Sequence, residues 1–165
     1  MNFSKFNKIL IIRFSSLGDV LLTTPLIRTI KYLYPHLKID FIVRKEYEST
    51  LVNNPHIDKL LTLERNYNKT ETRSQIIDSN YDLIIDLQNN LRSRRLIRKS
   101  STNIVRYKKP YLNRILLVKF KINRFKEILP IPVRYANSIP DFVLDNKGLE
   151  LFISPTNIAK IKEDN

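Results

Sequence analysis

The chain has no cysteine among its 165 residues. This absence excludes disulfide bonds, thiol catalysis and cysteine metal sites, and it suits the reducing environment of the cytoplasm. Histidine is almost as scarce, since His36 and His56 are the two examples and each follows a proline. Two histidines so far apart in the sequence do not form a zinc-type ligand set, so we expect no bound metal.

Glycine is also rare, with Gly18 and Gly148 as the two examples. A dinucleotide-binding fingerprint needs three closely spaced glycines, and a P-loop needs glycine followed by lysine and then serine or threonine. Neither pattern occurs in the chain. The sequence therefore excludes the two common glycine-rich phosphate loops, and other residues would have to bind any phosphate group.

Long apolar runs are missing as well. No stretch approaches the roughly 20 residues that span a bilayer, and the polar N-terminus lacks the apolar core of a signal peptide. Yet 42% of the residues are hydrophobic, and a chain of this length can form one domain with a proper core. We expect a folded, soluble protein that is at most peripheral to a membrane.

Acidic residues are outnumbered, with 16 Asp and Glu against 29 Lys and Arg. The net charge of +13 favours anionic partners, namely a phosphorylated glycolipid, a nucleic acid or an acidic membrane surface. The same excess can also be a solvated surface without a specific ligand. Charge alone does not separate these alternatives.

The most informative stretch lies between Lys8 and Pro35. It opens with the apolar run Ile9–Ile12, which is typical of a strand buried on both faces of a parallel sheet. The turn Ser15–Asp19 follows, and apolar residues then recur at helical spacing, at Leu22, Leu26, Ile30 and Leu33. Strand, turn and helix form the first unit of a doubly wound α/β domain, whose ligands bind at the carboxyl ends of the strands.

Asp19 comes after this first strand, at or near a helix N-terminus, so two roles are open. Aspartate commonly caps helices by accepting hydrogen bonds from free backbone N–H groups. Alternatively, the helix N-terminus stabilises the anionic carboxylate, which can then accept a proton from a bound substrate as a general base.

The remainder of the chain alternates apolar runs with helical segments. We predict further strands at residues 38–43, 59–63, 82–86 and 103–107, and helices at 46–52, 70–79 and 91–99. In the second of these helices, Ile76 and Ile77 are expected to face the core. Alternation of this kind favours an α/β fold with a parallel sheet and right-handed crossovers.

Three motifs resemble the lipopolysaccharide heptosyltransferases of glycosyltransferase family 9. The first is Arg13–Pro25, which reads RFSSLGDVLLTTP, and the second is Tyr81–Ser93, in which YDLIIDLQ and LRS match. The third, Asn54–Lys59, is similar to the segment that leads into the family's third strand. With weaker stretches between the motifs, the similarity runs from Lys8 to about Ser154.

The resemblance implies a GT-B glycosyltransferase, an enzyme built of two similar-sized Rossmann-like domains. The first domain binds the acceptor and the second binds the nucleotide sugar. We therefore expect residues 1–150 to form the acceptor-side domain, with a Rossmann-like, doubly wound parallel sheet, and residues 151–165 to begin the interdomain linker. The family pattern also favours a helix within residues 110–125. A domain for the nucleotide sugar is not expected within this sequence.

The resemblance further implies that heptose is transferred from ADP-heptose to the inner core of lipopolysaccharide, with inversion at the anomeric carbon. Asp19 is then the catalytic base, and no metal or cofactor takes part. The donor ADP-heptose is expected to bind a C-terminal half, which can also be a separate chain. The chain alone is therefore expected to be inactive, and its acceptor places it in the cytoplasm, peripheral to the inner membrane.

Acceptor-binding residues follow from the matching motifs and from the arginine-rich segment after the fourth strand. The candidates are Ser15, Ser16, Gly18, Gln88, Arg92, Arg94, Arg95, Arg98 and Arg134. Arginine suits a phosphorylated acceptor because its planar fork binds phosphate in two places. A charged helix face can also be merely solvated.

Two further segments bear on the acceptor. Basic residues near the loop after the third strand help hold acceptor phosphates in the family, and here Arg65, Lys69 and Arg73 are the candidates. Relatives often show a histidine before an Arg-Tyr pair, whereas proline-rich residues precede Arg134 and Tyr135 here. No role of that histidine is carried over to this chain.

A basic α/β binding module for nucleic acid or another phosphorylated polymer is the alternative function. Such a domain can hold a phosphate backbone without catalysis. Against it, the basic residues are not interleaved with aromatic ones, and the chain has no RNA-recognition motif. We therefore expect a transferase domain and no nucleic acid partner.

Overall fold

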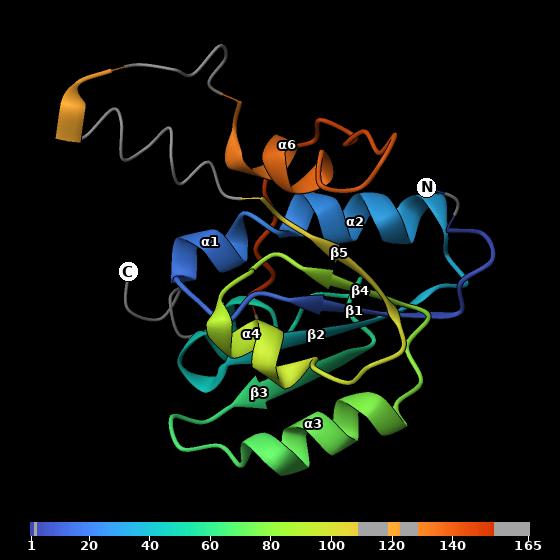
Figure 1. Ribbon diagram of the computed structural model, residues 1–165. Coiled ribbons are helices and arrows are strands. Elements are labelled where there is room, and N and C mark those ends of the chain that lie inside the picture. The colour runs from blue at the N-terminus through green and yellow to red at the C-terminus, as the bar shows by residue number, and fades with distance from the viewer. Residues whose placement is uncertain (2, 109–118, 123–128, 154–165) are drawn as a thin grey trace, which may run out of the picture.

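A five-stranded parallel sheet forms the centre of the protein (Figure 1). The computed structural model describes residues 1, 3–108, 119–122 and 129–153. The strands lie in the order β3-β2-β1-β4-β5, and each neighbouring pair is parallel. Their bounds are β1 Lys8–Ile12, β2 Lys38–Arg44, β3 Lys59–Leu63, β4 Leu83–Asp86 and β5 Asn103–Arg106. The strands predicted from apolar runs are all confirmed to within one residue at either end.

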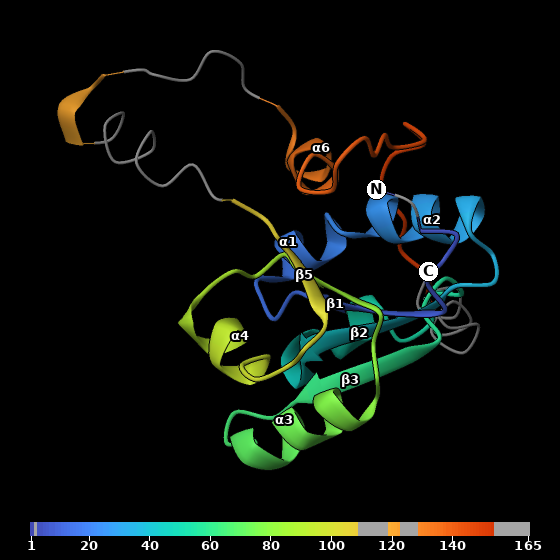
Figure 2. The same cartoon turned by 45° about the vertical axis from the view of Figure 1, so that its right-hand side comes forward.

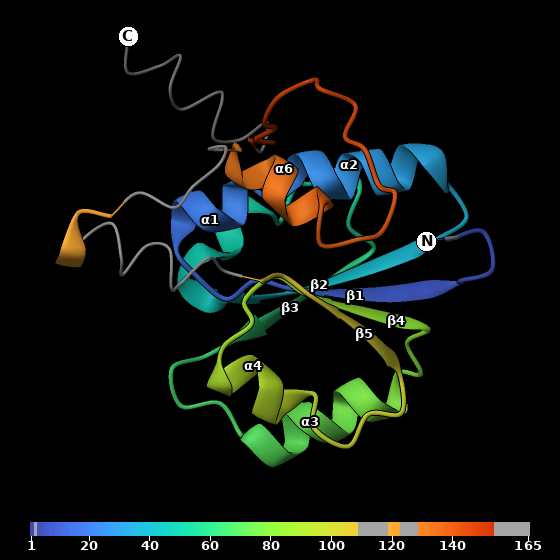
Figure 3. The same ribbon diagram turned by 45° about the horizontal axis from the view of Figure 1, so that its top comes forward.

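Helices cover both faces of the sheet, as Figure 3 shows. One face carries α1, α2 and α6, and the other carries α3 and α4. Their bounds are α1 Leu17–Leu21, α2 Thr24–Leu33, α3 Lys69–Asp78, α4 Leu91–Leu96 and α6 Ile131–Ala136, with a 3₁₀ helix η1 at Lys45–Thr50. This arrangement confirms the predicted Rossmann-like, doubly wound α/β fold. Among the described helices, none has the length and apolar content needed to cross a bilayer.

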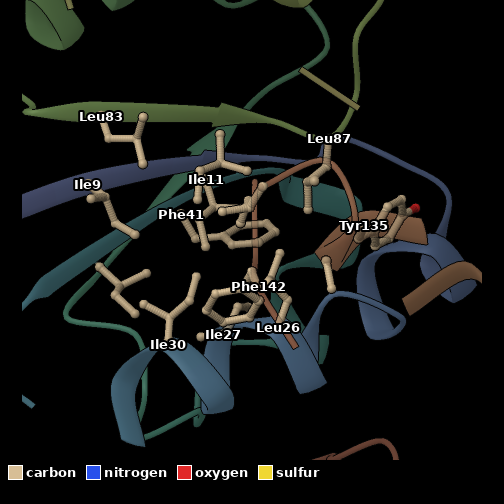
Figure 4. Close-up of a cluster of buried hydrophobic side chains, with 14 of the residues drawn as sticks. Ile9, Ile11, Leu26, Ile27, Ile30, Phe41, Leu83, Leu87, Tyr135 and Phe142 are labelled. Atoms are coloured by element: carbon tan, nitrogen blue, oxygen red, sulfur yellow. The ribbon is translucent and has the colours of Figure 1, made fainter. Parts of the chain in front are cut away.

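The core occupies both faces of the sheet, as continuous apolar strands require. On one face, alternate residues of β1 pack in a cluster with α2 (Figure 4), including Ile9, Ile11, Leu26, Ile27 and Ile30. On the other face, the intervening residues of β1 join a second cluster with α3 and α4, including Leu10, Ile12, Ile76 and Leu96. With β1 buried on both sides, the residues just after it are held in place at the carboxyl edge of the sheet (Figure 2).

The helix predicted after β1 is divided into α1 and α2. Pro25 lies in the first turn of α2, where backbone N–H groups have no acceptor within the helix, so the N–H that proline lacks is not missed. In the middle of a single long helix, Pro25 would remove a backbone hydrogen bond and disrupt the helix. Thr23 Oγ1 donates to Val20 O at 2.6 Å and helps to close α1. Within α2, Leu26 and Ile30 are buried, whereas Leu33 in the last turn is 51% exposed. Helical spacing alone therefore does not identify which of these residues are buried.

Three other local predictions need correction. In α3, Ile76 is buried but Ile77 is 37% exposed, because one face of the helix meets the sheet and adjacent residues point about 100° apart. The helix predicted at 91–99 ends at Leu96, and Lys99 follows with a positive φ of 76° that a helix cannot contain. The short helix at 46–52 is the 3₁₀ helix η1. Most of residues 110–125, and all of 154–165, lie outside the described residues.

Arg28 in α2 binds the segment that follows α6. Its Nε and Nη2 atoms donate to the two carboxylate oxygens of Asp145, both at 2.7 Å, and Nη2 also donates to Gly148 O at 3.0 Å. Arg28 Nη1 lies 3.0 Å from Glu150 Oε1. We call these contacts of Arg28 with Asp145, Gly148 and Glu150 the clamp. Beyond the clamp, Asn53 Nδ2 donates to Phe152 O at 3.4 Å. The described chain therefore stays on the domain to Phe152, and the domain boundary at residue 150 stays a prediction.

Replacing Arg28 by alanine should lower the free energy of unfolding by about 1.5–3 kcal/mol, the range for hydrogen bonds to charged groups. The variant leaves Asp145 and Glu150 partly buried without their cation. Denaturant unfolding at neutral pH measures the loss. Arg44→Ala is the matched control, because Arg44 and Glu46 form a more exposed pair and such pairs contribute about 0–1 kcal/mol. Equal losses in the two variants would contradict the clamp.

The clamp also gives the stability a pH dependence. The hydrogen bonds from Arg28 hold the pKa of Asp145 at about 2, below its usual 3.8. Between these values the unfolded chain binds more protons than the folded chain, so stability falls as the pH falls through them. Unfolding followed from about pH 5 to pH 2 should show a smaller decline in Arg28→Ala than in the parent.

Candidate active site

Two neighbouring strands end together at the carboxyl edge of the sheet. Ile12 of β1 is the register partner of Asp86 of β4. The backbone N–H groups of Leu87 and Gln88 both donate to Ile12 O, at 3.1 and 3.0 Å. Gln88 Oε1 in turn accepts from the N–H of Phe14 at 3.0 Å and of Ser15 at 3.4 Å. Gln88, predicted as an acceptor-binding residue, thus joins the loop after β1 to the loop after β4.

Asp19 lies in the first turn of α1, and Ser16 is the N-cap residue of this helix. The carboxylate oxygen Oδ2 accepts from Ser16 N at 3.4 Å and from Ser16 Oγ at 3.2 Å. The same oxygen lies 2.5 Å from Arg13 Nη2. Asp19 therefore supports the start of the helix, as the capping interpretation predicts. Its side chain is nevertheless 31% exposed, so it can also meet a ligand.

Arg13 is the residue of this site that the sequence analysis did not single out. Its side chain is only 5% exposed, and Nη1 donates to Leu87 O at 2.8 Å. The guanidinium carbon lies 5.7 Å from the ring centre of Tyr135 in α6. A charged residue directly after a fully apolar strand was the available signal, because such a position is buried and its charge needs a partner. That partner is Asp19.

Asp86 is fully buried and positions α4. Its Oδ1 accepts from Asn89 N at 2.7 Å, and its Oδ2 accepts from Ser93 Oγ at 2.8 Å. Burial raises the pKa of this carboxyl. Asn90 is the N-cap of α4 and accepts from the N–H groups of Arg92 and Ser93. These bonds fix the start of the arginine-rich helix next to the β1 loop.

A cationic pocket of about 460 Å³, which we call the β3-side pocket, opens beside these loops. Its lining residues come from the last residues of β2 and β3, from the segments that follow β1, β3 and β4, and from α3 and α4. Its basic lining residues are Arg44, Arg65, Lys69, Arg73, Arg92 and Arg95. Ser15 and Gln88 also line it, and Glu64 is an acidic lining residue. The pocket therefore brings together candidates from three separate stretches of the sequence.

The structure separates the arginines of the predicted basic helix. Arg92 and Arg95 line the β3-side pocket. Arg94 Nε donates to Asn89 Oδ1 at 3.0 Å, and Arg98 is exposed beyond the end of α4. Arg73 of α3 donates twice to Arg95 O, at 3.2 and 2.9 Å, and so holds the end of α4 against α3.

Arg134 lies in α6, away from the β3-side pocket. Its guanidinium carbon is 5.5 Å from the ring centre of Tyr107. With Tyr107 it lines another pocket of about 370 Å³, the β5-side pocket, whose remaining lining residues are Arg106, Lys108, Asn137 and Ser138.

Apart from its chain neighbours and the backbone of its own helix, no described residue has an atom within 4 Å of a Cβ atom added at Gly18, so the space beside this neighbour of Asp19 is open. Within the described part of the chain, no group of three or more His, Cys, Asp or Glu side chains is arranged to hold a metal ion.

The chain is similar in sequence to known glycosyltransferases. It is 29% identical over 161 residues to lipopolysaccharide heptosyltransferase 1 of Campylobacter coli, a match that covers 95% of this chain and 46% of the relative. The chain thus spans about half the length of the relative. No family model matches the chain.

Solved structures share the fold. The glycosyl transferase family 9 protein from Veillonella parvula superposes with a TM-score of 0.72 at 19% identity, covering 95% of this chain and 48% of that one. The ADP-heptose lipopolysaccharide heptosyltransferase II of Escherichia coli gives a TM-score of 0.63 at 16% identity, covering 95% and 50%. The resemblance predicted from the motifs is therefore confirmed: the chain is similar to the N-terminal part of the lipopolysaccharide heptosyltransferases of glycosyltransferase family 9.

Proposed function

We propose that the chain is the acceptor-binding domain of a glycosyltransferase that transfers heptose from ADP-heptose to the inner core of lipopolysaccharide. The observation that carries the proposal is the Asp19 carboxylate, which is partly exposed beyond the carboxyl end of β1 and is held by the buried Arg13. Ligands of doubly wound domains bind at this edge. The name of the Campylobacter coli relative supplies the kind of reaction.

The proposed chemistry is a single displacement with inversion. The oxygen of an acceptor hydroxyl attacks the anomeric carbon of heptose, the bond from that carbon to the diphosphate breaks, and Asp19 takes the hydroxyl proton. Arg13 Nη2, Ser16 N and Ser16 Oγ all contact Oδ2 of the Asp19 carboxylate. In this scheme Oδ1 accepts the proton. Neither metal nor cofactor has a role in this scheme.

The β3-side pocket is the proposed site for a phosphate on the acceptor. Ser15 and Gln88 line it, and Ser15 is adjacent to Ser16, which contacts Asp19. A phosphate bound by Arg92 and Arg95 would therefore place the neighbouring sugar close to the base. A lipid-linked acceptor also implies a cytoplasmic location with peripheral contact at the inner membrane, and the donor is assigned to a C-terminal half, fused or separate.

Removing the arginines that line the pocket should weaken binding of a phosphorylated core oligosaccharide. We expect Arg92→Gln with Arg95→Gln to lower the affinity by about tenfold or more, as the loss of charge-assisted hydrogen bonds predicts. Binding to the parent should also weaken steeply as salt is added. Calorimetric titration at several salt concentrations measures both effects.

The matched control removes charge from the same segment without altering the pocket lining. Arg98→Gln lies beyond the end of α4 and should change the affinity little, by the same titration. A dephosphorylated core should bind poorly at any salt concentration. Equal affinity of the parent for the phosphorylated and dephosphorylated cores would show that these arginines are a solvated face.

A further inference from the structure

We propose that the β5-side pocket is a second anion-binding site, which takes a second phosphate or carboxylate group of the acceptor. The identity of the ligand rests on the function proposed above, but the existence of the anion site does not. Three cations line this pocket, Arg106 at the end of β5, Lys108 just after it and Arg134 in α6. The pocket measures about 370 Å³, which is room for an anionic group and part of a sugar.

These cations have no carboxylate in direct contact among the described residues. Asp86 is the register partner of Arg106, and the charge of Arg106 counters the rise that burial causes in the pKa of Asp86. The Asp86 oxygens, however, accept hydrogen bonds from Asn89 and Ser93 and make no contact with Arg106. Lys108 and Arg134, together with Arg106, give the pocket a positive lining that attracts an anion, and arginine can bind an anion in two places.

Neutral donors complete the lining. Tyr107 lies under the guanidinium of Arg134, and Asn137 also lines the pocket. Ser138 is a lining residue too, but its hydroxyl already donates to Tyr135 O at 2.6 Å. Burial raises the pKa of Tyr107, so its hydroxyl remains protonated at neutral pH. The pocket thus offers hydrogen-bond donors to an oxyanion as well as positive charge.

Asp19 lies between the two pockets. On one flank, Ser16 contacts Asp19, and the adjacent Ser15 lines the β3-side pocket. On the other flank, Arg13 links Asp19 to Tyr135, whose ring meets the Tyr107 ring edge-on at 5.0 Å. Tyr107 lines the β5-side pocket.

The sheet order supports the same placement. β1 is central, and β3 and β5 are the opposite edges. An acceptor with an anionic group in each pocket would present the hydroxyl between those groups to Asp19. Such an arrangement selects acceptors that carry two anionic groups.

The first test uses inorganic phosphate and the isolated chain, followed by amide NMR. Phosphate should shift two sets of signals, one near Arg65 and Arg92 and one near Arg106 and Arg134. The double variant Arg106→Gln, Arg134→Gln should weaken binding at the second set by about tenfold or more and leave the first set unchanged. The matched control Lys38→Gln, Lys59→Gln removes the same charge at the amino ends of β2 and β3, away from both pockets, and should change neither set of signals.

The second test identifies the source of the anion. A core oligosaccharide with two anionic groups should lose affinity for the Arg106→Gln, Arg134→Gln variant, whereas one with a single anionic group should bind parent and variant alike. The proposal is overturned if phosphate shifts the first set of signals but not the second, or if the double variant titrates like the parent. It is also overturned if ADP-heptose, and not the oligosaccharide, shifts the second set. Failure of the proposed function is distinct, since the first set would then not respond to the oligosaccharide.

Discussion

Replacing Asp19 by asparagine or alanine should lower the turnover of a complete transferase carrying this domain by about 10²–10⁴-fold, the usual loss when a general base is removed. An acceptor hydroxyl is a weak nucleophile until its proton is taken. Asp19 is the carboxylate that the first turn of α1 places at the carboxyl edge of the sheet, with Oδ2 held by Arg13 and Ser16. Steady-state rates of a fusion between this chain and the C-terminal half of a relative measure the effect.

Loss of folding must be separated from loss of chemistry in this experiment. Removing the Asp19 charge leaves Arg13 buried without its partner, and an unpaired buried charge destabilises the fold. Rates are therefore normalised to the folded fraction. Asp82→Asn is the matched control, because Asp82 accepts from the N–H groups of Asn7 and Lys8 at the opposite edge of the sheet. Turnover of either Asp19 variant within about a factor of ten of the parent would leave Asp19 as a helix cap and nothing more.

The 165-residue chain tested by itself should show no measurable transferase activity. Holding donor and acceptor together can lower a barrier by roughly 7–11 kcal/mol. The chain spans 46% of the length of the Campylobacter coli relative, and the function proposed above assigns its candidate site to the acceptor. A domain that binds the acceptor alone forgoes most of this positioning. An assay with ADP-heptose and a phosphorylated core measures the activity.

Adding the C-terminal half of a relative, fused or as a separate chain, should restore turnover where the interface is intact. The Asp19→Asn variant with the same added half is the control, since it should remain slow. Substantial turnover by the 165-residue chain alone would show that both substrates bind to these residues, and the assignment of the chain to the acceptor side would then be wrong.

The strands were predictable because their pattern is local. A strand buried on both faces is apolar along most of its length, and Ile9–Ile12 and Leu83–Ile85 meet this condition. Helix ends were less predictable. The division between α1 and α2 depends on Pro25, and the exposure of Leu33 depends on where α2 lies on the sheet. Spacing along one helix does not contain that information.

The candidate site was predictable in part. Asp19 and Gln88 follow strands that the apolar runs reveal, and the motifs place them at the same edge. The tie between Arg13 and Tyr135 joins residues far apart in the chain, and no local pattern reports it. The division of the arginines depends on where α4 ends, because Arg92 and Arg95 reach the β3-side pocket while Arg98 lies past the helix. The roles of these residues stay predictions.

Calorimetric titration of the isolated chain with each substrate is the most direct test of the acceptor-side assignment. The account predicts that a phosphorylated core oligosaccharide binds, that added salt and the Arg92→Gln, Arg95→Gln variant weaken this binding, and that ADP-heptose produces no binding heat. Micromolar binding of ADP-heptose, together with no binding of the phosphorylated core, would contradict the account.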